Sequence, residues 1–159
     1  MRSAANIVIG VLVLAWILYR QLRPRAVRED SPYRVMAILA IIGVLELAQF
    51  SNDHRVPSEA WAYLVVSLVI GAGFGVLRGR YVHVWRQDGV LTRQGNVSTI
   101  VLWVVGIAIH LGFDTLIGRT SSEAKGLAST AILLYLAIAL AAQQYVTLRR
   151  AEHLKPGQA

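Results

Sequence analysis

Five long apolar stretches, separated by short polar segments, dominate this sequence. They cover residues 4–19, 35–50, 61–77, 99–117 and 127–146. The charged residues gather between the stretches, as expected in a membrane protein, because a charge at the bilayer centre costs at least about 2.5 kcal/mol. A helix needs about 20 apolar residues to cross a bilayer core. The pattern therefore predicts a single all-α transmembrane domain over residues 1–159, a bundle of five helices of which the first two are short.

Composition supports the membrane interpretation. The chain is 55% hydrophobic and only 16% charged, whereas soluble domains average about 45–50% apolar and about one quarter charged residues. The net charge of +7 raises the alternative of nucleic-acid binding. The basic residues flank the apolar stretches, however, which favours a lipid bilayer as the partner and no nucleic acid.

Cysteine is absent from the chain. The sequence therefore excludes disulfides, thiolate metal sites, c-type haem attachment and thiol redox chemistry.

The distribution of lysine and arginine predicts an orientation. If the N-terminus lies outside, residues 20–34, 78–97 and 147–159 lie inside and carry 12 of the 16 basic residues. Such a bias over short loops marks the cytoplasmic side. We therefore expect the N-terminus outside and a cytoplasmic C-terminal tail over 147–159. A cleaved signal peptide is the alternative for the first stretch, but no small-residue cleavage site follows it.

The polar segment between the third and fourth stretches has strand character. Residues 81–86 are rich in β-formers, Asp88-Gly89 is a favoured two-residue hairpin turn, and 90–93 form a return strand. We predict a short cytoplasmic β-hairpin between helices 3 and 4. An irregular interfacial loop is the alternative.

A few polar residues interrupt the apolar stretches, and each must find a partner away from lipid. They are Glu46 and Gln49 in the second stretch, His110 and Asp114 in the fourth, and Asn6 in the first. Counting along each predicted helix at about 1.5 Å per residue places all five in one layer on the outer side of the midplane. The sequence predicts this layer as a candidate ligand- or proton-binding site.

His110 and Asp114 are four residues apart and share a helix face. A carboxylate there can accept a hydrogen bond from an imidazole, and Glu46 of a neighbouring helix can complete a Glu–His–Asp chain. That arrangement suits a proton relay or an ion or ligand site opening outward. The alternative is purely structural, with buried polar groups joining helices to one another.

Metal and haem sites find little support. Imidazole and carboxylate ligands could come from Asp53, His54, Glu59, His110 and Asp114, but no tight metal-binding spacing joins them. A bis-histidine haem needs two helical histidines, and only His110 lies in a predicted helix. We therefore predict no metal and no cofactor.

Small residues mark candidate helix-packing positions. Gly71 and Gly75 form a Gly-x-x-x-Gly pair, and Ala108 and Gly112 form a similar step on the fourth helix. A phosphate-binding glycine loop is the alternative for the first pair, but no strand precedes it and no lysine follows.

Arginines beside the first and third helices are candidates for binding lipid headgroups. They are Arg20, Arg23, Arg25, Arg78 and Arg80. Orientation alone also explains them. No nucleophile with an adjacent base, no catalytic carboxylate pair and no nucleotide motif stands out, so we predict no catalytic residues.

The hairpin region resembles a known family. The similarity lies in Gly79-Arg80, Trp85-Arg86, Asp88-Gly89-Val90, Arg93-Gln94-Gly95, Leu102-Trp103 and the opening stretch 18–25. These motifs resemble the CcdC-like, DUF1453-type bacterial membrane proteins, and the opening resembles actinobacterial members. The resemblance implies a multi-pass plasma-membrane protein of uncharacterised function, sometimes encoded beside cytochrome c maturation components. It supplies no catalytic residues.

The sequence leads to two functional expectations. The first is a non-enzymatic accessory, scaffold or ligand-binding subunit whose partner is another membrane protein or a second copy of the chain. The alternative is a small oligomeric carrier or channel for protons, ions or a small ligand, using the layer around Glu46, His110 and Asp114. A membrane enzyme or cofactor protein ranks last.

Overall fold

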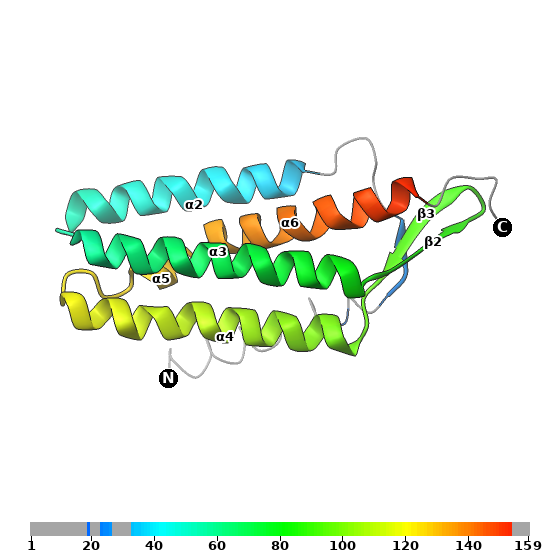
Figure 1. The fold of residues 1–159 in the computed structure, drawn as a ribbon. Helices are drawn as coiled ribbons and strands as arrows, with labels where there is room; N and C mark the ends of the chain where they lie inside the picture. The colour runs from blue at the N-terminus through cyan, green and yellow to red at the C-terminus, as the bar shows by residue number, and fades with distance from the viewer. Residues whose placement is uncertain (1–18, 20–22, 27–32, 154–159) are drawn as a thin grey trace, which may run out of the picture.

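A computed structural model of the chain describes residues 19, 23–26 and 33–153. Its helices are α2 (Arg34–Asp53), α3 (Ser58–Tyr81), α4 (Val97–Thr120), the short α5 (Leu127–Thr130) and α6 (Ile132–Glu152) (Figure 1). The four long helices are each long and apolar enough to cross a membrane. The prediction of a mostly helical chain with long apolar helices is thus confirmed for the described residues, and the four helices suggest a multi-pass membrane protein. The predicted helix over 4–19 lies outside the described residues except for Tyr19.

The last predicted helix is interrupted. The stretch 127–146 forms two helices, α5 and α6, which meet at Ala131. Gly126, just before α5, has φ of 92°, a left-handed conformation that glycine adopts without steric cost. α6 then continues beyond the predicted end to Glu152.

The predicted hairpin is confirmed. Strands β2 (His83–Gln87) and β3 (Val90–Gln94) pair antiparallel, with Trp85 opposite Thr92. Asp88 and Gly89 both have positive φ, 52° and 79°, as a two-residue type I′ turn requires. A third strand that the sequence did not indicate, β1 (Arg25–Ala26), pairs with β3 and completes a sheet of order β1-β3-β2.

The sheet closes one end of the bundle, opposite the α2–α3 connection (Figure 1). Val82, Val84 and Leu91 are buried there against Ala151 at the end of α6. Nη1 of Arg150 donates to the carbonyl oxygens of Gly79, Arg80 and Val82 at 2.8, 2.7 and 2.8 Å. This arginine therefore satisfies the carbonyls that the end of α3 leaves free.

The first turn of α4 is capped by its own sequence. The Asn96 side-chain oxygen accepts from the Thr99 backbone N–H at 3.0 Å, and Thr99 Oγ1 accepts from the Asn96 N–H at 3.0 Å. The Asn96 amide also donates to the Tyr81 carbonyl, 3.0 Å away, which ties α4 to the end of α3. This reciprocal capping box fixes where the chain leaves the sheet and re-enters the bundle.

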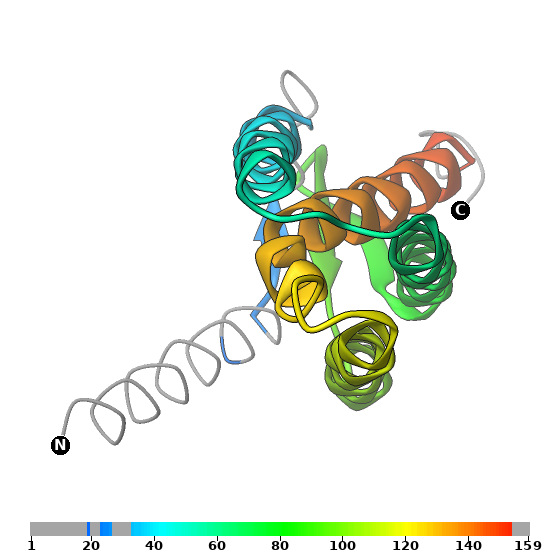
Figure 2. The same ribbon diagram turned by 90° about the vertical axis from the view of Figure 1, so that its left-hand side faces the viewer.

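α6 is the central helix. Viewed along the bundle, α5 and α6 lie between α2 on one side and α3 and α4 on the other (Figure 2). A Cβ built on Gly75 would collide with the Ala139 carbonyl oxygen, and one on Gly79 would lie 2.7 Å from Val146 Cβ. The glycines of α3 thus let α6 approach closely, in the manner of small-residue contacts between membrane helices.

α2 is attached more loosely. Only Gly43 and Leu47 of this helix are buried. A Cβ on Gly43 would lie 2.5 Å from the Leu134 backbone nitrogen, so this glycine lets α2 approach α6 closely. Leu47 joins an apolar core at the α5 end of the bundle together with Ala60, Leu64, Ile117, Ala124, Leu127, Ala128 and Ala131.

Candidate functional site

His110 is fully buried on α4, where α4 faces α3 and α5. Its Nε2 lies 2.9 Å from the Ala128 carbonyl oxygen, and its Nδ1 lies 2.5 Å from Ser67 Oγ. A carbonyl oxygen only accepts hydrogen bonds, so Nε2 carries the hydrogen that it donates. In the neutral ring, Nδ1 then accepts from the Ser67 hydroxyl. Both ring nitrogens are therefore satisfied without any water or ligand.

Asp114, one turn further along α4, also binds α5. Its Oδ1 accepts from the Ala128 backbone N–H at 3.0 Å, and its Oδ2 accepts from the Ser129 hydroxyl at 2.6 Å. His110 and Asp114 thus hold the two backbone polar groups of one residue, Ala128. In an unbroken helix the Ala128 carbonyl would accept from the N–H four residues on. Because the helix is interrupted at Ala131, that carbonyl accepts from His110 instead.

We call Ser67, His110, Asp114, Ala128 and Ser129 the α5 cluster. Its members come from α3, α4 and α5, so the hydrogen bonds join three elements inside the bundle. Sequence spacing places His110 and Asp114 on one helix face, but nothing in the sequence shows that their partner is a short helix within the last apolar stretch.

An aromatic ring closes this cluster on the side of the sheet. Tyr135 of α6 is buried and stacks on His110, with ring centroids 4.3 Å apart and an interplanar angle of 26°. A Cβ built on Gly71 would collide with the Tyr135 ring, and one on Gly106 would lie 2.7 Å from its hydroxyl oxygen. Gly71 therefore makes room for a tyrosine side chain, whereas Gly75 makes room for helix backbone.

A second buried polar group lies nearer the sheet. The Arg78 guanidinium of α3 sits over the Trp103 ring of α4, 3.8 Å from its centroid, and Arg78 is only 1% exposed. Among the described residues, four buried polar side-chain atoms have no hydrogen-bond partner: Nε and Nη2 of Arg78, Nε1 of Trp103 and Oε1 of Gln143. Gln143 lies on α6 beside the residue after Arg78, since a Cβ built on Gly79 would be 2.9 Å from the Gln143 carbonyl oxygen. We call Arg78, Trp103 and Gln143 the arginine cluster. Sequence spacing placed Arg78 among arginines at the membrane surface, but the structure places it inside the bundle.

The other predicted headgroup arginines are distributed differently. Arg80 is exposed, and Arg23 is exposed and donates to the Tyr19 hydroxyl. The backbone of Arg25 forms part of β1. Arg20 lies outside the described residues.

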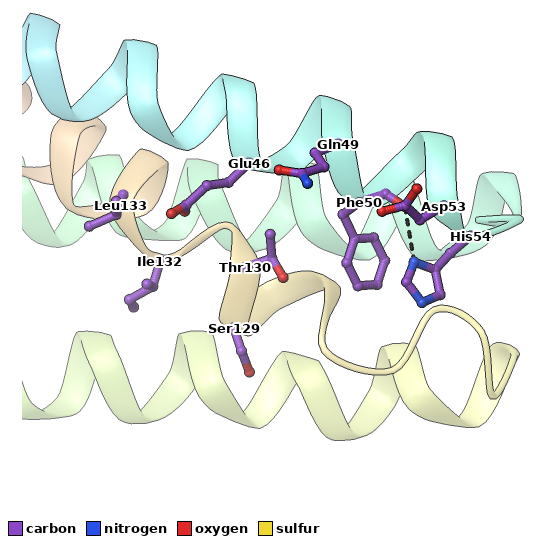
Figure 3. Close-up of a pocket in the computed structure, with 9 residues that line it drawn as sticks. All are labelled: Glu46, Gln49, Phe50, Asp53, His54, Ser129, Thr130, Ile132 and Leu133. Carbon is purple, nitrogen blue, oxygen red and sulfur yellow. Dashed lines mark hydrogen bonds between the residues drawn. The ribbon is translucent and has the colours of Figure 1, made fainter. Parts of the chain in front are cut away.

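An open groove of about 700 Å³ runs between α2 and the α5–α6 segment (Figure 3). Its lining residues are Glu46, Gln49, Phe50, Asp53, His54, Ser129, Thr130, Ile132 and Leu133. His54 stacks on Phe50 with ring centroids 4.3 Å apart, and its Nδ1 lies 3.1 Å from the Phe50 carbonyl oxygen. Carboxylate and amide groups thus lie beside apolar side chains in one open groove.

The predicted polar layer therefore divides into two places. Glu46 and Gln49 line the groove, whereas His110 and Asp114 belong to the α5 cluster. Ser129 connects them, since it lines the groove and donates to Asp114. Both His110 nitrogens are taken by Ser67 and Ala128, and within the described chain no hydrogen bond joins His110 to Glu46. Asn6 lies outside the described residues.

Two further predicted residues lie on the surface of α4. Ala108 and Gly112 are exposed, and a Cβ on Gly112 would meet no atom within 4 Å. In the described ranges, no group of three or more histidine, cysteine, aspartate or glutamate side chains is arranged to hold a metal ion.

Sequence reasoning missed several buried polar residues. Ser67 is a single small hydroxyl residue within the third apolar stretch, and Tyr135 and Gln143 lie within the last one, where the surrounding residues are apolar. A search for every polar side chain in the middle of an apolar stretch, amides and hydroxyls included, would have found them.

The four long apolar helices are compatible with a multi-pass membrane protein. A family match identifies the chain more closely. The chain belongs to the DUF1453 family, described as CcdC protein, whose model matches residues 3–156. The family resemblance seen in the sequence is thereby confirmed. No curated protein and no solved structure matches the chain.

Proposed function

We propose that this chain is a non-enzymatic, multi-pass protein of the bacterial plasma membrane that acts by binding, as an accessory, scaffold or ligand-binding subunit. Its N-terminus lies outside and its C-terminus in the cytoplasm. The observation that carries the binding role is the open groove between α2 and the α5–α6 segment.

Charge supports the orientation. The sheet end of the bundle carries exposed Arg80, Arg86, Arg149 and Arg150. Lysine and arginine near helix ends are retained on the cytoplasmic side. On this basis the sheet faces the cytoplasm and the α2–α3 connection faces outward.

The chemistry of the groove favours an amphipathic occupant. Glu46 and Asp53 provide carboxylates and Gln49 an amide, and Ile132 and Leu133 provide apolar surface. A ligand or partner helix with a cationic or hydrogen-bond-donating group on an apolar body complements both kinds of surface. Few convergent polar groups within an apolar lining are typical of ligand sites.

The buried serine–histidine pair favours binding over hydrolysis. Ser67 and His110 lie 2.5 Å apart, as a nucleophile and its base would, but Ser67 is only 1% exposed and the ring is covered by Tyr135. A nucleophile must contact its substrate. The pair is therefore better suited to joining α3 to α4 and α5.

The absence of native cysteine makes the orientation easy to test. Single variants Ser122→Cys, in the α4–α5 connection, and Asp88→Cys, in the hairpin turn, are treated with a membrane-impermeant maleimide on intact cells with a permeable outer envelope. We expect labelling of Ser122→Cys at once and of Asp88→Cys only after permeabilisation. The reverse pattern would contradict the proposed orientation.

The groove is tested by site-specific photocrosslinking in cells. A benzophenone amino acid replaces Leu133, which lines the groove, or Leu111, which is exposed on α4. We expect a discrete crosslinked protein or ligand adduct from position 133 that is absent from position 111. Glu46→Gln should weaken that product, whereas Glu59→Gln, at an exposed acid outside the groove, should not. Identical products from both positions would refute a binding groove.

A carrier or channel is the second candidate. It is favoured by Asp114, which is bonded through Ser129 to the groove and through Ala128 to His110. In liposomes holding a pH- or potassium-sensitive dye, a carrier gives flux above that of empty liposomes, and His110→Leu abolishes it. The binding role requires no flux.

A further inference from the structure

The arginine cluster holds a positive charge with no counter-charge among the described residues. Arg78 lies buried on α3 with Nε and Nη2 unbonded, and the neighbouring Trp103 Nε1 is unbonded as well. No carboxylate in the described part of the chain forms an ion pair with Arg78. A buried cation without a counter-charge is strongly unfavourable inside a membrane bundle. An anion bound at the cluster would neutralise this charge.

The free groups have the chemistry of an oxyanion site. Three of the four unpartnered atoms in the cluster are hydrogen-bond donors. The guanidinium fork matches two oxygens of a phosphate, and the indole N–H only donates. Because the guanidinium lies over the Trp103 ring at 3.8 Å, the edges of the two planes can approach one phosphate. The free Gln143 oxygen can accept from a hydroxyl of the same molecule.

The depth of the cluster suits a lipid phosphate. Arg78 is three residues before Tyr81, the last residue of α3, which is about 4.5 Å along the axis. Trp103 is six residues after Val97, the first residue of α4, or about 9 Å. A helix of 24 residues is about 36 Å long, a few ångströms more than a hydrocarbon core of about 30 Å. In helices that span such a core, both positions fall within its outer part, close to the headgroups on the sheet side. This level is the same whichever face of the membrane the sheet occupies.

The cluster lies close to the surface of the bundle, at its positively charged end. Trp103 and Gln143 are each 6% exposed, so both residues of the cluster reach the surface of the bundle slightly, whereas Arg78 is 1% exposed. α6 packs mainly on α3 and α2, whereas α4 packs on α3 and α5, so α4 and α6 have little direct contact with each other. Exposed Arg80 and Arg150 add a local potential that attracts anions.

We propose that Arg78, Trp103 and Gln143 bind the phosphate group of a phospholipid from the leaflet next to the sheet. Arg78 supplies the charge and two donors, Trp103 supplies a third donor, and Gln143 accepts from a headgroup hydroxyl such as those of a glycerol group. The site is separate from the groove at the α5 end, so failure of the groove experiment leaves it unaffected.

Native mass spectrometry of the purified full-length chain in detergent tests the proposal. Delipidated protein is mixed with phosphatidylglycerol, phosphatidylcholine or inorganic phosphate. We expect Arg78→Gln to lower phosphatidylglycerol retention about tenfold, the loss for about 1.4 kcal/mol of charge-assisted hydrogen bonding. The control Arg80→Gln, an exposed arginine two residues along the same helix, should change it less than about twofold.

The three probes separate the sources of phosphate. Retention of both lipids that depends on Arg78 shows recognition of the lipid phosphate, and a preference for phosphatidylglycerol shows use of its hydroxyls as well. Binding of inorganic phosphate alone places the oxyanion site in the aqueous phase and overturns the lipid assignment. Equal effects of Arg78→Gln and Arg80→Gln on all three probes overturn the site itself.

A second variant guards against a folding defect in Arg78→Gln. Trp103→Phe keeps an aromatic ring beneath the guanidinium and removes only the indole N–H. We expect it to lower phosphatidylglycerol retention about threefold while the protein remains monodisperse. If a folded Trp103→Phe protein retains phosphatidylglycerol as well as the wild type does, Trp103 has no role in the site. If Arg78→Gln is also misfolded, the same result for Trp103→Phe overturns the whole proposal.

Discussion

The α5 cluster and the arginine cluster are both buried in the bundle, but they differ in whether their polar atoms have hydrogen-bond partners. In the α5 cluster, both nitrogens of His110 and both oxygens of Asp114 have partners within the chain. In the arginine cluster, Arg78 is equally buried, yet two of its nitrogens have none. Tyr135 lies between them, stacked on His110.

This difference separates two uses of polar residues in a membrane protein. A satisfied group joins helices and holds a shape, here the short α5 helix and the interruption after it. An unsatisfied group is costly until something binds it. The sequence predicts a ligand- or proton-binding role for His110, inside an apolar stretch, and a surface role for Arg78, beside one. Only their partners in the structure distinguish a residue that joins helices from one that is free to bind a ligand.

The largest expected effect breaks both clusters at once. Gly71→Leu would drive a side chain into the Tyr135 ring, which is held from the other side by Gly106 and His110. Overpacking typically costs about 1–3 kcal/mol and more where the neighbour cannot move, and a whole leucine side chain in place of a hydrogen lies at the upper end. We expect loss of monodisperse protein in size-exclusion chromatography.

Gly73→Leu is the matched control for that variant. It lies two residues along the same helix, and a Cβ there meets no atom within 4 Å. It should leave the elution profile unchanged. Equal damage from both glycine variants would show that helix flexibility, rather than the fit of Tyr135, limits folding.

The second effect is confined to the α5 cluster. His110→Leu preserves bulk but leaves the Ala128 carbonyl and the Ser67 hydroxyl without partners. We expect a loss of about 2–4 kcal/mol in the free energy of unfolding, measured by denaturant titration in detergent. His54→Leu, at an exposed histidine, should cost less than about 1 kcal/mol. If His110→Leu leaves the free energy of unfolding unchanged, α5 is held by packing alone.

The smallest change in the free energy of unfolding is expected for Arg78→Met, in contrast to the loss expected for His110→Leu. Arg78→Met removes a buried charge whose nitrogens Nε and Nη2 have no partner in the chain and keeps an apolar contact with Trp103. In lipid-free detergent we expect the free energy of unfolding to change by less than about 1 kcal/mol, or to rise, because a buried unpaired charge is itself unfavourable. A loss as large as that of His110→Leu would show that the protein itself compensates Arg78.

Much of the architecture could be predicted from residue patterns. Hydropathy located the four long helices, and the Asp88-Gly89 turn between β-forming residues located the hairpin. The third strand escaped prediction because β1 has only two residues, Arg25 and Ala26, and depends on β3 for its hydrogen bonds. The interruption at Ala131 escaped it because the residues that bond to α5, His110 and Asp114 on α4, are distant in the sequence.

The sequence by itself determined which parts of the described chain are helical and how the basic residues are distributed at the helix ends. These properties follow from local composition, since backbone hydrogen bonds within each helix are satisfied by the helix itself. The tertiary structure alone decided which face of each helix turns inward, and so which of Glu46, His110 and Arg78 is open, satisfied or buried without a partner. The physical reason is that lipid is as apolar as a protein core, so a spanning helix is apolar all round and its sequence does not mark the packed face.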